Sequence, residues 1–208
     1  MGDASRAVHA LWPATAESHW RDALRSYPKV VERQGVARLP DLDLWYREEL
    51  PAAIGKRRPR YATHAELVKL TEWKMARGVW RAPNLVLVKG NDAEQVKKTT
   101  AAALAAAPHP TAPVAALAKL DGVGPATASA LAAAAEPTIY PFFDELVAAQ
   151  VPTLGPVKWT LGYYAKYAEA LRERARKLGG EWTPALAERA LWAAVGGKAG
   201  NAALTGAG

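Results

Sequence analysis

The feature that most constrains this chain is a short glycine-containing segment, residues 120–125, which reads Leu-Asp-Gly-Val-Gly-Pro. Alanine-rich stretches with helical patterning precede and follow it, so two helices are expected to meet at a tight turn. Glycine adopts positive φ values without strain, and Pro125 suits the first turn of a helix, where a missing N–H costs nothing. Leu120 and Val123 are expected to fill the space between the two helices.

The predicted fold class is all-α, a two-lobed helical bundle. Alanine is abundant, half of the 208 residues are hydrophobic, and runs of strand-forming residues are few. We expect one domain over residues 1–195, with a central lobe over about 63–150 that contains the turn at 120–124. The N-terminal and C-terminal helices are expected to form the other lobe. Residues 196–208 are poor in large apolar side chains, which predicts a flexible tail.

Capping residues and helix breakers predict where several helices begin and end. Thr63 and Glu66 have the spacing of a capping box, which predicts a helix from about 64 to 77 that ends at Gly78. Pro125 predicts a helix from about 125 to 135, and Asp41 or Asp43 is expected near the start of a helix at 40–53. Further helices are expected over about 93–106, 113–119, 144–150, 159–178 and 184–195.

Charge and composition restrict the classes of partner. The formal net charge is +7 and the pI is about 9.7, which favours a polyanionic partner. The absence of cysteine excludes disulfides, cysteine-based zinc sites and an iron–sulfur cluster, and the four histidines lack metal-ligand spacing. No apolar run reaches the roughly 18 residues of a membrane span, and the N-terminus lacks an apolar signal core. We therefore expect a cytoplasmic monomer without a metal, a cofactor or a membrane partner.

The turn at residues 120–125 has the physical properties of an anion site. A turn of this type exposes N–H groups at the beginning of the second helix, where the helix dipole also favours negative charge. A phosphate oxygen would suit those groups, and a monovalent cation on the turn is a further option. The alternative is a tight connection between two helices that binds no ligand.

The string Leu120-x-Gly122-Val123-Gly124-Pro125-x-Thr127-Ala128 resembles the helix-hairpin-helix of the DNA glycosylase superfamily. In that family an essential aspartate begins a helix some twenty residues after the hairpin. Asp144 stands at that distance from Gly124, after an aromatic connection at 137–143. The resemblance covers roughly residues 113–150 and implies a protein that binds double-stranded DNA and excises a base. Asp144 would then be catalytic; the alternative is that it only caps a helix, as aspartate does well.

The chemistry that the resemblance implies needs little more than one carboxylate. Cleaving an N-glycosidic bond builds positive charge on the deoxyribose, which a nearby carboxylate stabilises while it orients or deprotonates water. Glu145 is the fallback carboxylate, although a solvated acid in a first helical turn is the simpler interpretation. Bifunctional members carry a lysine nucleophile where this chain has Ala126, so the resemblance implies a monofunctional enzyme that leaves an abasic site.

Further residues are candidates for binding DNA or an extruded base. Lys74, Arg77 and Arg81 are expected to form a basic face. The resemblance implies that the early helix leads into a loop that wedges into the duplex, which would be the region from Lys74 to Trp80. The cluster at residues 56–60 would either clamp phosphates or form a solvated loop. The candidate DNA contacts are Gly122, Val123, Gly124, Ala126, Thr127, Lys56, Arg57, Arg58, Lys74 and Arg77. The candidate base-pocket residues are Trp45, Tyr46, Trp73, Tyr140 and Phe142.

No motif of the chain identifies the substrate. Repair of an alkylated or deaminated base is one hypothesis. The small size and the missing lysine also resemble small bacterial glycosylases that remove glucosylated hydroxymethylcytosine from phage DNA. A roomy polar pocket would favour that defence role, whereas a narrow aromatic slot would favour repair. The hypothesis from another class is a non-catalytic helix-hairpin-helix protein that only grips DNA.

Overall fold

The computed structural model describes residues 11–200, and all regular structure in this part of the chain is helical, so the all-α prediction is confirmed. The longer helices are α1 (Glu17–Glu32), α4 (His64–Arg77), α6 (Ala93–Ala105), α8 (Pro125–Ala135), α10 (Leu161–Leu178) and α11 (Pro184–Ala194). The shorter segments are α2 (Leu39–Leu44), η1 (Trp45–Glu49), α3 (Leu50–Lys56), α5 (Ala82–Gly90), α7 (Ala112–Leu117), α9 (Glu145–Ala148) and η2 (Pro152–Leu154).

Most of the predicted helix ends agree with the structure because the caps act locally. Thr63 Oγ1 accepts the N–H of Glu66, and the Glu66 carboxylate accepts the N–H of Thr63, so the capping box starts α4 as predicted. The predicted helix at 40–53 is less regular than expected. It consists of α2, α3 and an intervening π-helical turn, η1.

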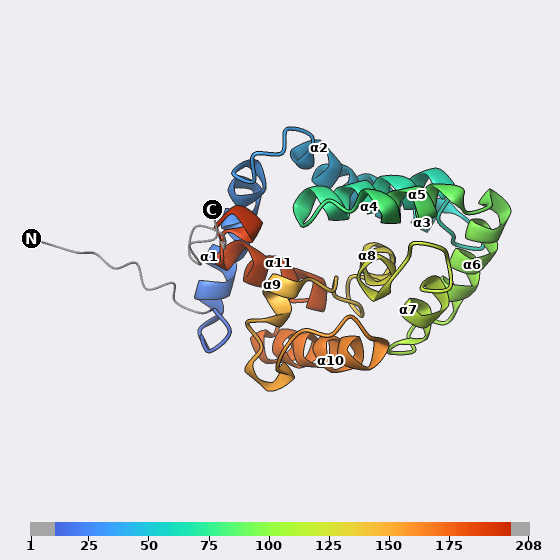
Figure 1. Cartoon of the computed structure of the whole chain (residues 1–208). Helices are drawn as coiled ribbons and strands as arrows, with labels where there is room; N and C mark the ends of the chain where they lie inside the picture. The colour runs from blue at the N-terminus through green and yellow to red at the C-terminus, as the bar shows by residue number, and fades with distance from the viewer. Residues whose placement is uncertain (1–10, 201–208) are drawn as a thin grey trace, which may run out of the picture.

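The helices form two packing groups (Figure 1). α1 lies along α11, which also packs against α9 and α10, so the first and last helices are neighbours, and both Trp20 and Trp192 are fully buried. In the other group α4 contacts α2, α5, α6 and α8, while α7 lies between α6 and α8. The boundaries differ from those expected, since α3 packs with the central helices, α2 contacts both α1 and α4, and α9 packs against α11.

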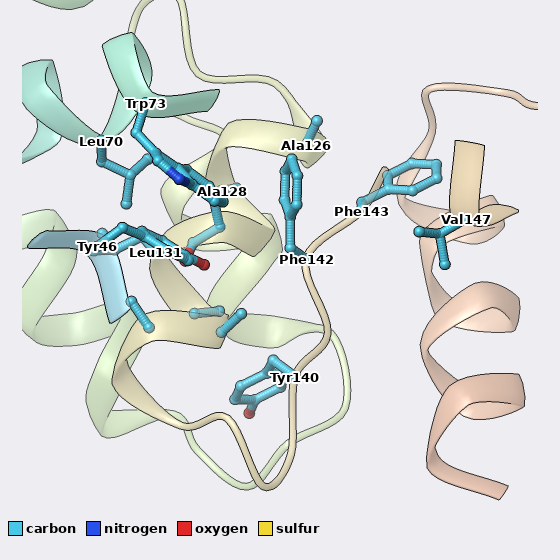
Figure 2. Packing of buried hydrophobic residues seen from close by; sticks show 14 of the residues in the cluster. Tyr46, Leu70, Trp73, Ala126, Ala128, Leu131, Tyr140, Phe142, Phe143 and Val147 are labelled. Carbon is cyan, nitrogen blue, oxygen red and sulfur yellow. The ribbon is translucent and has the colours of Figure 1, made fainter. Parts of the chain in front are cut away.

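An extended connection between α8 and α9 runs through the middle of the molecule. Figure 2 shows Phe142 turned toward Trp73 and Ala126, and Phe143 turned the opposite way, toward Val147. The rings of Phe142 and Trp73 are 5.2 Å apart, and Phe143 lies among the tyrosines of α10, 5.1 Å from Tyr167. Because successive side chains of an extended chain point to opposite sides, this connection is anchored in both helix groups just before Asp144.

The C-terminal end is packed further than expected. Gln34, two residues after the end of α1, donates to the Gly196 carbonyl and accepts the N–H of Ala199. Residues 196–200, predicted to belong to a flexible tail, therefore pack on the body of the protein, and residues 201–208 lie outside the described part. None of the helices between residues 11 and 200 is long and apolar enough to cross a membrane.

Candidate functional site

The two glycines of the turn have different structural tasks. Gly122 has a φ of +73°, and a Cβ there would lie 2.6 Å from the Asn84 carbonyl oxygen and 2.9 Å from the Leu87 Cβ on α5. Gly124 has an ordinary φ of −86°, and a Cβ there would meet nothing within 4 Å. Gly122 is therefore required by the backbone and by close packing, whereas Gly124 leaves an open, exposed surface.

The turn is fixed to α5 by one side chain that sequence analysis did not assign to it. Asn91 donates from Nδ2 to the carbonyls of Leu87, Val88 and Asp121, and its Oδ1 accepts the N–H of Asp121. The next residue, Asp92, is the N-cap of α6, where it accepts the N–H of Gln95. The side chain of Asn91 thus sets the position of the turn.

The beginning of α8 offers free donors. Its N-cap, Gly124, has no capping side chain, and the first intrahelical bond runs from the Ala128 N–H to the Gly124 carbonyl. The N–H groups of Ala126 and Thr127 precede that bond and have no intrahelical acceptor. Val123 was predicted to contact DNA. It is a core residue instead, and its N–H donates to the Leu120 carbonyl, so the prediction is wrong for this N–H group.

Asp144 is the N-cap of α9. Its Oδ1 accepts the N–H of Leu146 at 2.8 Å, and the residue is 9% exposed. The capping role is therefore confirmed. One such bond leaves most of the acceptor capacity of a carboxylate unused. The neighbouring Glu145 is exposed, as expected for a solvated first-turn acid.

Two adjoining pockets connect Asp144 with the beginning of α8. One is lined by Asp144, Glu145, Phe142, Phe143, Gly78 and Val79, and the other by Asn84, Gly124, Pro125, Ala126 and Thr127. Lys74, Arg81 and Trp159 line both pockets. We call the two pockets together the Asp144 groove. The acid, the turn and two cations therefore share one continuous surface.

Lys74 lies half-buried between the two pockets. Burial lowers the pKa of its amine, and the nearby charge of Arg81 lowers it further, while Asp144 and Glu145 oppose the change. The ion pairs found within residues 11–200 do not include Lys74. Its amine is therefore free to meet a ligand in the groove.

Arg77 is buried, so the prediction that it contacts DNA is wrong. The residue is 2% exposed, and its Nη2 lies 2.5 Å from Glu188 Oε1 on α11. Its guanidinium packs against aromatic rings, 4.5 Å from the centre of Trp192 and 5.0 Å from that of Phe142. The residue joins the two helix groups and presents no charge to a surface ligand.

The basic cluster at residues 56–60 lies at the other end of α8. Arg60 pairs with Glu136, which directly follows the last residue of α8. That helix has 11 residues and is about 16 Å long, so the cluster and the turn are well separated. Arg57 forms a two-pronged ion pair with Glu66, so it is structural rather than a DNA contact. Lys56 and Arg58 are exposed, and their role stays a prediction.

The aromatic residues predicted to form a base pocket lie in the core. Tyr46 stacks on Trp73 with ring centres 3.5 Å apart, and its hydroxyl donates to the Ala130 carbonyl. Tyr140 donates to the His109 carbonyl, and Trp45 is covered by Lys69. All five predicted residues are buried at 7% exposure or less. Tyr46, Trp73 and Phe142 line one cavity of about 100 Å³, and Phe142 alone of the five also lines the Asp144 groove, so the base-pocket role stays a prediction.

Trp159 is the aromatic residue of the groove that sequence analysis missed. It is 46% exposed, and its ring lies 4.9 Å from that of Phe143. Its place in a loop with Gly155 and Pro156, next to the N-cap Thr160, was not a distinctive signal, because Phe143 stands in the same position before the N-cap Asp144 and is fully buried.

Residues 11–200 contain no group of three or more acidic or histidine side chains that could hold a metal ion. Comparison of the chain with protein-family models, with curated proteins and with solved structures finds no match. The geometry and chemistry of the Asp144 groove therefore have to indicate the function.

Proposed function

We propose that the protein is a DNA glycosylase that hydrolyses the N-glycosidic bond of a damaged or modified base and leaves an abasic site. The observation that supports the proposal is the shared surface of Asp144 and the beginning of α8. An acid on the far side of the molecule from the turn would have argued against it.

DNA would bind through its phosphates at one end of the groove. The free N–H groups of Ala126 and Thr127 and the positive end of the α8 dipole suit a phosphate oxygen. Arg81 lines the same pocket and supplies a full positive charge. Binding of this kind releases counterions, so the affinity should fall steeply with salt.

Hydrolysis would take place at the other end of the groove. The sugar of an extruded nucleotide would lie beside Asp144, whose carboxylate stabilises the positive charge of the transition state and orients the attacking water. Phe142, Phe143 and Trp159 line the same pocket and provide aromatic surface against which a base can stack. The near-complete burial of Asp144 strengthens its electrostatic effect.

The segment between α4 and α5 is suited to act as a wedge that enters the DNA duplex. Val79 and Trp80 are large apolar residues that are 41% and 48% exposed, and Val79 lines the pocket of Asp144. Apolar side chains that enter DNA between base steps unstack them and occupy the vacated space. We assign this role to Val79, which lies within the region predicted from the sequence, whereas Trp80 packs against Arg38 and lines neither pocket of the groove.

The size of the pocket bears on the choice of substrate. The pocket beside Asp144 has a volume of about 60 Å³, and three of its lining residues are aromatic. A space of this small volume favours a small modified or damaged base over a glucosylated cytosine. Repair is therefore the favoured role, and defence against phage remains the second candidate because Lys74, Arg81 and Glu145 add polar groups to the same wall.

The test compares Asp144→Asn with the wild-type protein on a panel of duplexes. Asparagine caps helices as well as aspartate, so α9 should remain intact. The panel holds alkylated, deaminated and oxidised bases together with glucosylated phage DNA, and released bases are identified by mass spectrometry. We expect release from at least one duplex and a rate that is about 10²–10⁴-fold lower in the variant.

Asp92→Asn is the matched control, because it makes the same change at another helix N-cap, outside the Asp144 groove, and should leave base release unchanged. Equal release by wild type and Asp144→Asn would refute the catalytic role. DNA binding without release from any duplex would support the alternative, a non-catalytic protein that grips DNA.

A further inference from the structure

The groove holds an amine that the proposed hydrolysis does not use. Lys74 comes from the last turn of α4, and it lines both the pocket of Asp144 and the pocket of Ala126. The sequence predicts a monofunctional enzyme because position 126 carries alanine. In the folded chain an amine reaches the same pocket from a different helix, so the alanine at 126 does not decide the question.

The surroundings of Lys74 are those of a nucleophilic lysine. Burial and the charge of Arg81 lower the pKa of the amine, which raises the fraction of the neutral, reactive form at neutral pH. A desolvated lysine beside another cation is a known way to activate an amine toward a carbonyl carbon. Lys74 also forms no ion pair with any residue in 11–200 that would occupy the amine.

We propose that Lys74 forms an imine with C1′ of an abasic deoxyribose in the Asp144 groove, which gives the protein a DNA strand-cleaving lyase activity. The inference rests on the proposed function in one respect, since it takes the groove as the place where the sugar binds. It replaces the monofunctional prediction with two successive activities, base release by water and strand cleavage by the lysine.

The reaction needs no group beyond the chain, the abasic site and water. The Nζ lone pair of Lys74 adds to the C1′ aldehyde of the ring-opened sugar, and loss of water gives a protonated imine. The Asp144 carboxylate takes a proton from C2′, and the C3′–O bond breaks with its electron pair leaving on the 3′ phosphate. Water then hydrolyses the imine, which releases an unsaturated aldehyde on one DNA end and restores the amine.

The test traps the imine on a preformed abasic site, so that no base has to be excised. Full-length protein is mixed with a duplex that contains one abasic site, and cyanoborohydride reduces any imine to a stable covalent adduct. We expect an adduct with the wild type and its loss in Lys74→Arg, which keeps the positive charge but cannot form the imine. Lys69→Arg, a change of a half-buried lysine on the same helix, should leave trapping unchanged.

Two further measurements separate chemistry from binding. Affinity for a duplex with a tetrahydrofuran abasic analogue should be the same in Lys74→Arg and wild type, and peptide mapping should place the adduct on Lys74. An adduct that persists in Lys74→Arg, that maps to another amine, or that fails to form although the wild type binds the analogue would overturn the proposal. An adduct on Lys74 without base release from any duplex would refute the proposed glycosylase activity and support the lyase activity. Base release without an adduct would support the glycosylase activity and refute the lyase activity.

Discussion

At the scale of single residues, the turn shows how two identical amino acids can serve different purposes. Gly122 occupies a left-handed conformation against α5, and even one added carbon would overlap the Asn84 carbonyl. Gly124 is extended and open on the side of the groove. The sequence pattern predicts a turn that needs glycine. Why each of the two positions needs glycine follows only from the neighbours of that residue in the structure.

Alanine substitutions of Gly122 and Gly124 should therefore have opposite effects on stability and on DNA binding. Gly122→Ala should lower the free energy of unfolding by about 2 kcal/mol or more, because it adds left-handed strain to a backbone overlap. Gly124→Ala should change stability by less than about 0.5 kcal/mol but weaken DNA binding, since the new methyl group stands where a phosphate would approach. Urea unfolding and fluorescence anisotropy measure the two effects. A stable Gly122→Ala variant would contradict the packing argument.

At the scale of elements, local sequence signals predict well where helices begin and end, but they predict poorly how the helices lie relative to one another. The capping box of α4 and the proline of α8 both act where they were predicted to act. Nothing in the sequence indicates the π-helical turn η1 or the role of Asn91 as a link between α5 and the turn. Both depend on contacts between segments that are distant along the chain.

Neighbouring alanine substitutions can separate a cap from a positioning side chain. Asp92→Ala removes the N-cap of α6 and should cost about 1 kcal/mol of stability without affecting DNA binding. Asn91→Ala removes the bonds to α5 and to the turn, so it should cost a similar free energy and also weaken DNA binding. Unfolding midpoints and anisotropy titrations test this. Equal DNA affinity in both variants would show that the turn keeps its place without Asn91.

At the scale of the whole molecule, buried polar groups connect the two helix groups. Arg77 of α4 pairs with Glu188 of α11, and Asp43 accepts hydrogen bonds from Tyr27 of α1 and Trp73 of α4. Asp43 was expected near a helix start, yet it is 2% exposed and also pairs with Arg47. These bonds hold α4, and with it Lys74, in a fixed place relative to Asp144.

The buried carboxyl should make stability depend on pH. Burial raises the pKa of Glu188 to about 7 from its ordinary 4.5, although Arg77 acts in the opposite direction. Because the folded state holds this proton more tightly than the unfolded state, the stabilising contribution is complete below pH 4.5 and is lost as the pH rises through about 7. Relative to Glu188→Gln, wild-type stability should fall by up to about 3 kcal/mol across this range. Urea unfolding of both proteins from pH 4 to pH 8 measures the difference, and a constant difference would mean that folding does not change the pKa of Glu188.

The sequence by itself determined the helical fold class, most helix boundaries, the position of the glycine turn and the capping role of Asp144. These features follow from interactions between residues a few positions apart, which propensity, caps and breakers express directly. Only the tertiary structure decided which charges face the groove, because that depends on how α4, α8 and the loop of Trp159 pack. Arg77 and Lys74 are three positions apart on α4, yet packing buries the first against Glu188 and turns the second toward Asp144.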